Sequence, residues 1–141
     1  MWIETITYKG YDDTSYTEDF CFNISRAELI KMNYSVSGGM KELLKRIYQE
    51  KDNVKLYKLF EDLIDMSYGR KSLDGKHFEK STEILNEFKQ SEAYSEFIIK
   101  LMQDAKYAAK VVRGILPETD VSDEELARVT ADLMPNSMGN I

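Results

Sequence analysis

The segment TEDFCFNIS, residues 17–25, decides the fold of this chain. Apolar residues alternate with polar or small ones along it, at Phe20, Phe22 and Ile24. Alternation with a period of two is typical of a strand that buries one face. The segment therefore predicts a strand over residues 17–24, and the flanking residues predict what that strand connects.

The residues before this strand predict its partner. Residues 2–8, WIETITY, are rich in β-branched and aromatic side chains, which favour strands. The connecting residues include Gly10, Asp12, Asp13 and Ser15, which favour turns. We therefore expect the two strands to pair as an antiparallel hairpin.

The residues after this strand predict helices. Ser25 and Glu28 match a capping box, in which each side chain accepts a hydrogen bond from the other residue's backbone N–H. A helix is therefore expected from about Arg26. The segment SVSGG, residues 35–39, interrupts the helix with adjacent glycines, and a second helix is expected to begin near Gly39.

Two apolar stripes follow, separated by the polar residues 51–53. Both stripes have the spacing of an amphipathic helix, so they predict two consecutive helices or one kinked helix. A shorter helix is expected over residues 82–89. The first stripe consists of Met40, Leu43, Leu44 and Ile47, and the second of Leu56, Leu59, Phe60, Leu63 and Ile64.

The longest helix is expected over residues 92–113, with Ser91 as its N-cap and with Gly114 and Pro117 at its end. Its apolar residues cover roughly half of the circumference, more than one neighbouring helix would cover. Either this is a central core helix with several neighbours, or its face is shared between the core and a partner chain. The residues that we expect to bind a partner under the second interpretation are Tyr94, Phe97, Ile98, Leu101, Met102, Ala105, Ala109 and Val112.

These elements predict an α+β fold that is mostly α-helical, with the N-terminal antiparallel hairpin followed by about five helices. Residues 1–117 are expected to form a single domain. Residues 118–141 form an acidic extension, in which Ser122 and Glu125 match another capping box and predict a short helix. We expect the last residues of this extension to be mobile.

The composition narrows the classes of partner. The chain has 141 residues, a length typical of one domain, with a formal net charge of −6 and a pI near 4.9. It lacks the basic field that draws a protein to nucleic acid or anionic lipid. No apolar run approaches the roughly 18 residues of a membrane span, and no leader pattern begins the chain. We therefore expect a cytosolic protein whose partners are proteins.

Residues suited to catalysis are sparse. The only histidine, His77, lies beside Lys76 in the segment of residues 67–81, with no nucleophile or orienting group in the pattern. The only cysteine, Cys21, cannot form an internal disulfide. GRKS, residues 69–72, lacks the upstream glycine and preceding strand of a phosphate-binding loop, and the acidic residues lack calcium-loop spacing. The sequence therefore predicts no catalytic, cofactor-binding or metal-binding residues.

The same segment, SYGRKSLDGKHFEKS, has two interpretations that involve no catalysis. In the first, Tyr68 closes the preceding helix against the core, and a tight turn at Asp74 and Gly75 brings Leu73 near Phe78. In the second, the basic residues of the segment meet acidic surfaces of a neighbouring copy. Both interpretations give the segment a role in structure or assembly.

Several segments together resemble the tail assembly chaperones of long-tailed phages and prophages of Gram-positive bacteria. The resemblance covers nearly all of residues 1–117, and the order and spacing of the segments carry it more than any single one. The segments are DFCFNIS, RAELIKM with its Gly-Gly turn, SYGRKSLDGKHFEKS, QSEAYSEFIIKL and AKYAAKVVRGILP.

The resemblance implies a non-enzymatic protein that acts in the cytoplasm of the bacterial host and is absent from the mature virion. Such chaperones bind the tape measure protein, keep it soluble and help recruit the tail tube protein. Many also exist in a longer, frameshifted form, and several self-associate, so a homo-oligomer is expected. The competing hypothesis is a small phage-encoded interaction or regulatory module without a tail role. An enzyme is disfavoured because no catalytic group can be assembled.

Overall fold

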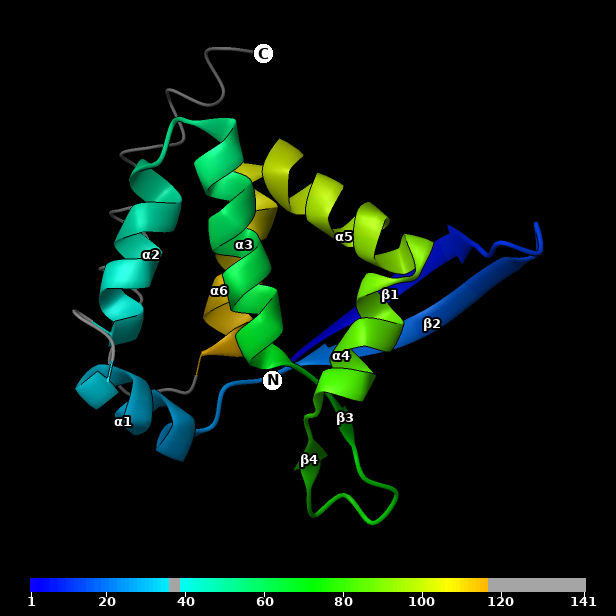
Figure 1. Ribbon diagram of the computed structural model, residues 1–141, viewed down its shortest axis with the longest axis horizontal. Helices are drawn as coiled ribbons and strands as arrows, with labels where there is room; N and C mark the ends of the chain where they lie inside the picture. The colour runs from blue at the N-terminus through cyan, green and yellow to red at the C-terminus, as the bar shows by residue number, and fades with distance from the viewer. Residues whose placement is uncertain (36–38, 117–141) are drawn as a thin grey trace.

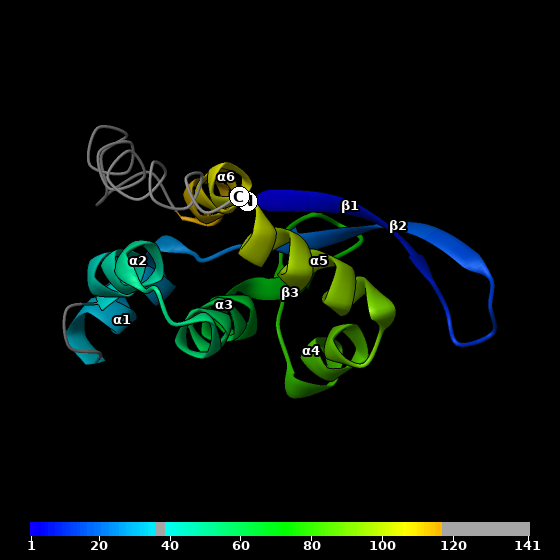
Figure 2. The same ribbon diagram turned by 90° about the horizontal axis from the view of Figure 1, so that it is seen from above.

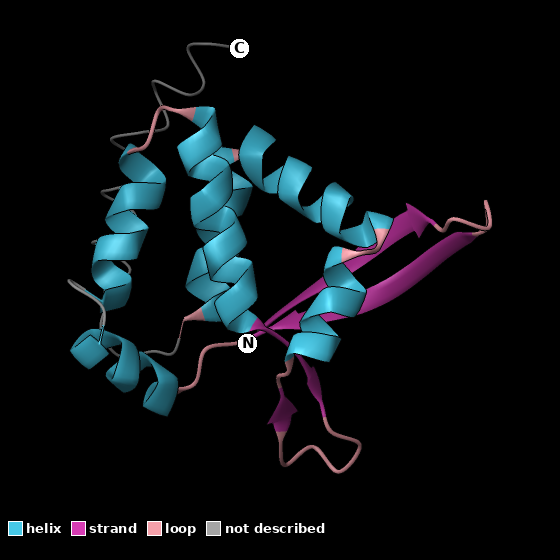
Figure 3. Ribbon diagram, viewed as in Figure 1, coloured by secondary structure: helices cyan, strands magenta, loops and turns pink. Residues whose placement is uncertain are grey.

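The structure of the chain is a computed structural model that describes residues 1–35 and 39–116 (Figure 1). The fold is α+β and mostly helical, as the sequence predicts, and Figure 3 shows α4 and α5 beside the strands. The predicted helix in residues 118–141 lies outside the described residues. The described elements are β1 (Trp2–Lys9), β2 (Ser15–Phe22), α1 (Arg26–Ser35), α2 (Gly39–Gln49), α3 (Asn53–Ser67), β3 (Tyr68–Lys71), β4 (Phe78–Glu79), α4 (Thr82–Lys89), α5 (Glu92–Gln103) and α6 (Ala105–Ile115).

The described strands form one sheet in the order β1-β2-β3-β4. β1 and β2 pair antiparallel along their whole length, which confirms the predicted hairpin. β2 covers Ser15–Phe22, whereas the sequence predicted a strand over 17–24. Ile24 leaves the ladder because its backbone N–H donates to the carbonyl oxygen of Ile115 in α6, 3.2 Å away.

One face of the β1–β2 hairpin is buried near its base and the other is exposed. Glu4 and Ile6 of β1 point inward and are buried, whereas Ile3, Thr5 and Thr7 point to solvent. α5 packs against β1, and Figure 2 shows α6 beside the N-terminal end of that strand. The helices therefore cover one face of the hairpin.

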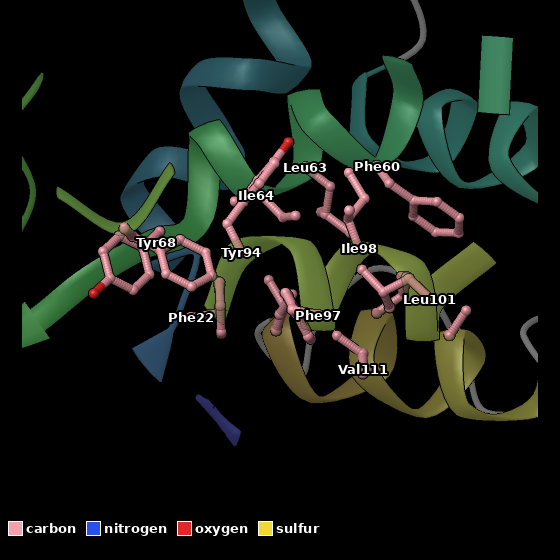
Figure 4. Close-up of a cluster of buried hydrophobic side chains, with 14 of the residues drawn as sticks. Phe22, Phe60, Leu63, Ile64, Tyr68, Tyr94, Phe97, Ile98, Leu101 and Val111 are labelled. Carbon is pink, nitrogen blue, oxygen red and sulfur yellow. The ribbon is translucent and has the colours of Figure 1, made fainter. Parts of the chain in front are cut away.

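Aromatic rings from several elements form the centre of the core (Figure 4). Phe22 of β2 stacks on Phe97 of α5, with ring centroids 4.7 Å apart. Phe88 of α4 stacks on Tyr68 with centroids 4.4 Å apart, and it meets the edge of Tyr94 at 5.6 Å. Such ring pairs add about 0.5–1.5 kcal/mol each beyond their burial. This cluster joins the sheet to α3, α4 and α5.

The first strand also packs against the last described helix. The Trp2 ring lies 6.3 Å from the Tyr107 ring in an edge-on arrangement. Gly114 lets this happen, because a side chain at position 114 would overlap the Trp2 ring. The absence of a Cβ therefore brings β1 and α6 into close contact.

Residues 67–81, in which the sequence predicted a tight turn at Asp74 and Gly75 but no strands, contain a second hairpin. β3 pairs with β2 at Tyr68 and Gly69, and β4 pairs with β3. Tyr68 is buried and ends α3, as expected. The expected approach of Leu73 to Phe78 is wrong, because Leu73 is fully exposed beyond the pairing of Lys71 with Phe78. Strands this short leave no periodic pattern.

The long helix expected over residues 92–113 is also wrong. The chain breaks at Asp104, which has an extended backbone (φ −133°, ψ 98°) between α5 and α6. Its side chain accepts a hydrogen bond from the backbone N–H of Tyr107 at 3.0 Å and so acts as the N-cap of α6. As a result α3, with 15 residues, is the longest described helix, and there are six described helices.

The start of α1 confirms the predicted capping box and adds a third partner. The Ser25 backbone N–H donates to Glu28 at 2.9 Å, and the Glu28 backbone N–H donates to Ser25 Oγ at 3.1 Å. Lys80, which follows β4, donates to Glu28 Oε2 at 2.8 Å and to the Met66 carbonyl at 2.8 Å. Burial opposes ionisation of Glu28, but the hydrogen bonds from Lys80 and Ser25 outweigh it and lower its pKa.

Substituting Asp104 tests the break between α5 and α6. Asp104→Ala should lower the free energy of unfolding by about 1 kcal/mol, because α6 loses its N-cap acceptor. Asp104→Asn is the matched control, since an asparagine oxygen accepts the same hydrogen bond, and it should stay near the wild-type value. Urea denaturation followed by circular dichroism measures both. Equal stability of the alanine variant and wild type would contradict the capping role.

Glu28→Gln tests the pairing with Lys80 through its pH dependence. Because the pKa of Glu28 is lowered on folding, its charge stabilises the fold above the ordinary value of 4.5, and this contribution disappears as the pH falls below that value. Glutamine keeps the capping box but removes the charge. The variant should therefore be less stable than wild type at pH 7, and this difference in urea midpoints should shrink as the pH falls through the lowered pKa of folded Glu28. A pH-independent difference would contradict this assignment.

Candidate functional site

The residues expected to bind a partner lie along α5 and α6, and most are in the core. Phe97 and Leu101 are 1% and 2% exposed, and Val112 is fully buried. Tyr94 and Ile98 are also buried, and Figure 4 shows both pointing toward α3. α5 packs against β1, α3, α4 and α6. Several neighbours within the same chain therefore account for much of the wide apolar sector.

The other three expected residues are half-buried. Met102 lies in the last turn of α5, and Ala105 and Ala109 lie in the first turns of α6. We call these three residues the junction surface. Asp104 separates Met102 from the two alanines, so the surface follows the change of direction between the helices. Partner binding by these residues stays a prediction, but only this part of the set is accessible.

Positive charge borders the junction surface. Lys106 and Lys110 are exposed on α6, each next in sequence to one of the alanines. α6 contains no acidic residue, although the whole chain carries a net charge of −6. The junction surface therefore combines small apolar side chains with a cationic margin. Such a surface fits an amphipathic helix that carries acidic residues beside its apolar face.

A shallow groove lies between β1 and α5, with a volume of about 540 Å³. It has a mixed lining of charged, polar and apolar residues, and the exposed Ile99 contributes to it. The lining residues are Glu4, Thr5, Ile6, Thr7, Glu96, Phe97, Ile99, Lys100, Gln103 and Asp104.

The buried carboxylate in this groove, Glu4, is held by neighbouring groups. Glu4 is 8% exposed and accepts a hydrogen bond from Trp2 Nε1 at 2.8 Å. Lys100 Nζ lies 3.5 Å from Glu4 Oε2 and 4.1 Å from the centre of the Tyr107 ring. Burial, and then the Glu4 carboxylate, raise the pKa of Tyr107. These contacts join β1, α5 and α6, and they bring no nucleophile to the carboxylate.

The sequence analysis overlooked Glu4. Glu4 shares the inward face of β1 with Trp2 and Ile6, because alternate residues of a strand point to the same side. The period-two pattern of residues 2–8 therefore contained a signal for a buried carboxylate. The pattern could not identify Lys100 as the cation that contacts Glu4, because Lys100 lies far away in the sequence.

The remaining polar candidates are exposed. His77 Nδ1 lies 3.9 Å from Asp74 Oδ1, and the His77 side chain is 74% exposed, in agreement with a solvated position. Within residues 1–35 and 39–116, no group of His, Cys, Asp and Glu side chains could hold a metal ion. None of the helices in the described part of the chain is long and apolar enough to span a membrane.

Substituting Glu4 tests its structural role. Glu4→Leu should lower the free energy of unfolding by about 1–3 kcal/mol, because the Trp2 indole N–H loses its acceptor. Glu4→Gln retains an acceptor and should cost less. Trp2 is the only tryptophan, so its fluorescence emission reports directly on this site. An unchanged emission maximum and stability in the leucine variant would show that the contact contributes nothing.

Comparison with protein families places this chain in one of them. A family model described as phage tail assembly chaperone matches residues 1–139. No curated protein and no solved structure matches the chain. The family match includes both hairpins and the junction surface, and it extends beyond residue 117, where the resemblance seen in the sequence stopped. The chain therefore belongs to the phage tail assembly chaperone family.

Proposed function

We propose that this protein binds the tape measure protein of a long-tailed phage or prophage of Gram-positive bacteria, keeps it soluble, and helps recruit the tail tube protein. The junction surface is the observation that carries this proposal. Its three residues are half-buried at the edge of the core, where Met102 and Ala109 pack against it, and they lie on the helices whose sequence resembles tail assembly chaperones.

The shape of the junction surface supports docking of a helix. Ala105 and Ala109 are four residues apart and so lie on one face of α6. Their small side chains allow a second helix to approach closely, within the range of roughly 8–10 Å between helix axes. Lys106 and Lys110 would meet carboxylates beside the apolar face of that helix. Met102 would supply an adaptable apolar contact at one end.

The proposed role requires no chemical step. Glu4 is the buried carboxylate in the groove between β1 and α5, and its contacts with Trp2 and Lys100 support a structural role for it. We infer a non-enzymatic protein without a cofactor, active in the cytoplasm of the bacterial host, self-associating and absent from the mature virion. Residues 1–117 would form the chaperone domain, and residues 118–141 an acidic extension of it.

Co-expression with the tape measure protein of the same genome tests this function. Wild type should bring the tape measure protein into the soluble fraction and co-purify with it. Met102→Asp and Ala109→Asp should each lower this recovery at least about tenfold, because a charge would face the apolar side of the bound helix. Ile30→Asp is the matched control, since Ile30 is 56% exposed on α1, and it should behave as wild type.

The folding of each variant separates loss of binding from loss of structure. Circular dichroism should show native helix content for Met102→Asp and Ala109→Asp. Phe97→Asp, at a position that is 1% exposed, should instead unfold. Full recovery of the tape measure protein by both junction variants would exclude the junction surface. Failure of folded wild type to solubilise it would contradict the proposed function and favour a regulatory module.

A further inference from the structure

β1 forms one border of the sheet. The strand order is β1-β2-β3-β4, so β2 is the only strand among the described residues that pairs with β1. Figure 1 shows β2 along one side of β1, with no described strand along the other side. We call this border, over residues 3–7, the β1 edge. An unpaired edge presents a row of backbone N–H and C=O groups that can pair with another extended chain.

The turn of the first hairpin shows which residues direct their backbone groups to the β1 edge. The Gly10 backbone N–H donates to the Thr14 carbonyl oxygen at 2.8 Å. Opposed residues of an antiparallel pair alternate between hydrogen-bonded and non-hydrogen-bonded positions. Counted back from Gly10 through the register, the even-numbered residues of β1 therefore bond to β2. The backbone N–H and C=O groups of Ile3, Thr5 and Thr7 face outward.

The opposite side of β2 gives the same assignment independently. The Asn23 backbone N–H donates to the Ser67 carbonyl oxygen at 2.7 Å, and Cys21, two residues earlier, lies opposite Gly69 of β3. Cys21 therefore directs its backbone groups to β3 and away from its β1 partner, Ile3. The backbone groups of Ile3 consequently face outward. In the described part of the chain, no backbone hydrogen bond reaches the β1 edge from outside the hairpin.

α5 forms a wall beside the β1 edge. Thr5 and Thr7 line the groove between β1 and α5, although their side chains point to solvent on the other face of the strand. Their position at the groove agrees with outward-facing backbone groups. Glu96 and Ile99 line the groove on the helix side. A strand added along the β1 edge therefore has one row of side chains toward α5 and the other row toward solvent.

The β1 edge has the properties of an edge that can pair. Ile3 is 52% exposed on the solvent face of β1, and Ile99 is 51% exposed at the groove, so apolar contacts are available on both sides. Proline, lysine and inward-pointing charges commonly prevent pairing at sheet edges. Residues 3–7 contain neither proline nor lysine, and their inward-pointing carboxylate, Glu4, lies beside Lys100.

The charge of the groove indicates which side chains an added strand should carry. The groove is lined by the carboxylates of Glu4, Glu96 and Asp104 and by one cation, Lys100. Lys100 Nζ lies 3.5 Å from Glu4 Oε2. Neither Glu96 nor Asp104 forms an ion pair with another residue in the described ranges. Two carboxylates therefore remain to attract basic side chains.

We propose that the β1 edge binds an extended segment of a partner protein, which adds to the sheet as a further strand and directs basic and apolar side chains toward α5. The backbone groups of Ile3, Thr5 and Thr7 hold the segment by strand pairing. Glu96 meets its basic side chains, and Ile99 meets its apolar ones. This inference goes beyond the proposed function, because the junction surface takes a helix whereas the β1 edge takes an extended chain.

Charge favours this occupant over three others. A second copy pairing through the same edge would bring an identical acidic groove against the first, and like charges repel. The acidic extension of this chain, residues 118–141, has the same sign as the groove. The phosphate backbone of a nucleic acid is also negative. A basic extended segment of another protein has the complementary charge.

Synthetic peptides test the proposal on the full chain. The labelled probe KTVTKTV carries lysine and valine on one face and threonine on the other, and fluorescence anisotropy should show that wild type binds it. Two further peptides carry N-methyl groups at alternate residues, in the two possible sets. One should bind at least about tenfold more weakly, because it loses the N–H donors that face β1, and the other should bind as the probe does. ETVTETV should also bind more weakly, because its charge is reversed.

Protein variants locate the bound segment. Thr5→Pro removes an outward-facing N–H without removing a hydrogen bond between β1 and β2, so it should weaken probe binding at least about tenfold with native circular dichroism. Thr5→Val is the matched control, since both variants lose the hydrogen bond to Asp19 but valine keeps the N–H, and it should bind as wild type. Glu96→Lys should weaken binding at least about threefold. Glu83→Lys, at an exposed position on α4, changes the net charge equally and should have no effect.

Contrary results would overturn the inference at different steps. Failure of folded wild type to bind the probe, or equal binding of both N-methylated peptides, would reject strand addition. Unchanged binding by folded Thr5→Pro would place the segment away from the β1 edge, and if that variant unfolds, the N-methylated peptides decide with wild type. Equal losses in Glu96→Lys and Glu83→Lys would reject the contact with α5. A wild-type dimer that the probe dissociates would assign the edge to a second copy.

Co-expression keeps this inference separate from the proposed function. Thr5→Pro leaves the junction surface unchanged, so it should recover the tape measure protein as wild type does. Loss of probe binding with full recovery of the tape measure protein would support two distinct binding surfaces. Loss of recovery in folded Thr5→Pro would contradict their independence.

Discussion

The structure depends on the contact between Phe22 and Phe97. A two-stranded hairpin is marginally stable in water and needs a covering layer. The Phe97 ring supplies it by stacking on Phe22 at 4.7 Å, at the point where β2 also meets β3. Phe88 and Tyr68 complete the cluster from α4 and from the end of α3. The same contact therefore fixes where both hairpins leave the core.

Short sequence patterns predicted most of the helices and strands. The predictions that were wrong failed at particular residues, for reasons that the structure shows. The capping box joins Ser25 to Glu28, three residues away, and the structure confirms that α1 starts there. The alternation of apolar residues before it also depends on near neighbours, and the structure confirms a strand whose apolar side faces the core. The apolar spacing continues across Asp104, so the sequence predicted one helix there and missed the N-cap of α6. The spacing of apolar residues gives no information on where the backbone changes direction. The second hairpin escaped detection because β4 is only two residues long.

The candidate site shows a different limit of sequence reasoning. The periodicity of residues 92–113 predicted a helical segment with more apolar surface than one neighbouring helix would bury. It could not identify the elements that bury each residue. Burial of Phe97 and Leu101 comes from elements distant in the sequence, and it leaves Met102, Ala105 and Ala109 accessible. Likewise, the charged residues of the two hairpins can be read from the sequence, whereas the different directions in which the hairpins project are a property of the fold.

The close contact of Trp2 with Gly114 has a consequence for how the chain matures during translation. β1 can pack against α6 only after residue 114 has been synthesised, so the Trp2 side chain lacks this contact while the residues between them are made. Contacts of such wide sequence separation slow folding, since a long loop must close before they form. In the nascent chain the Trp2 ring therefore lacks this packing partner until α6 has been made, so the junction between β1 and α6 forms late.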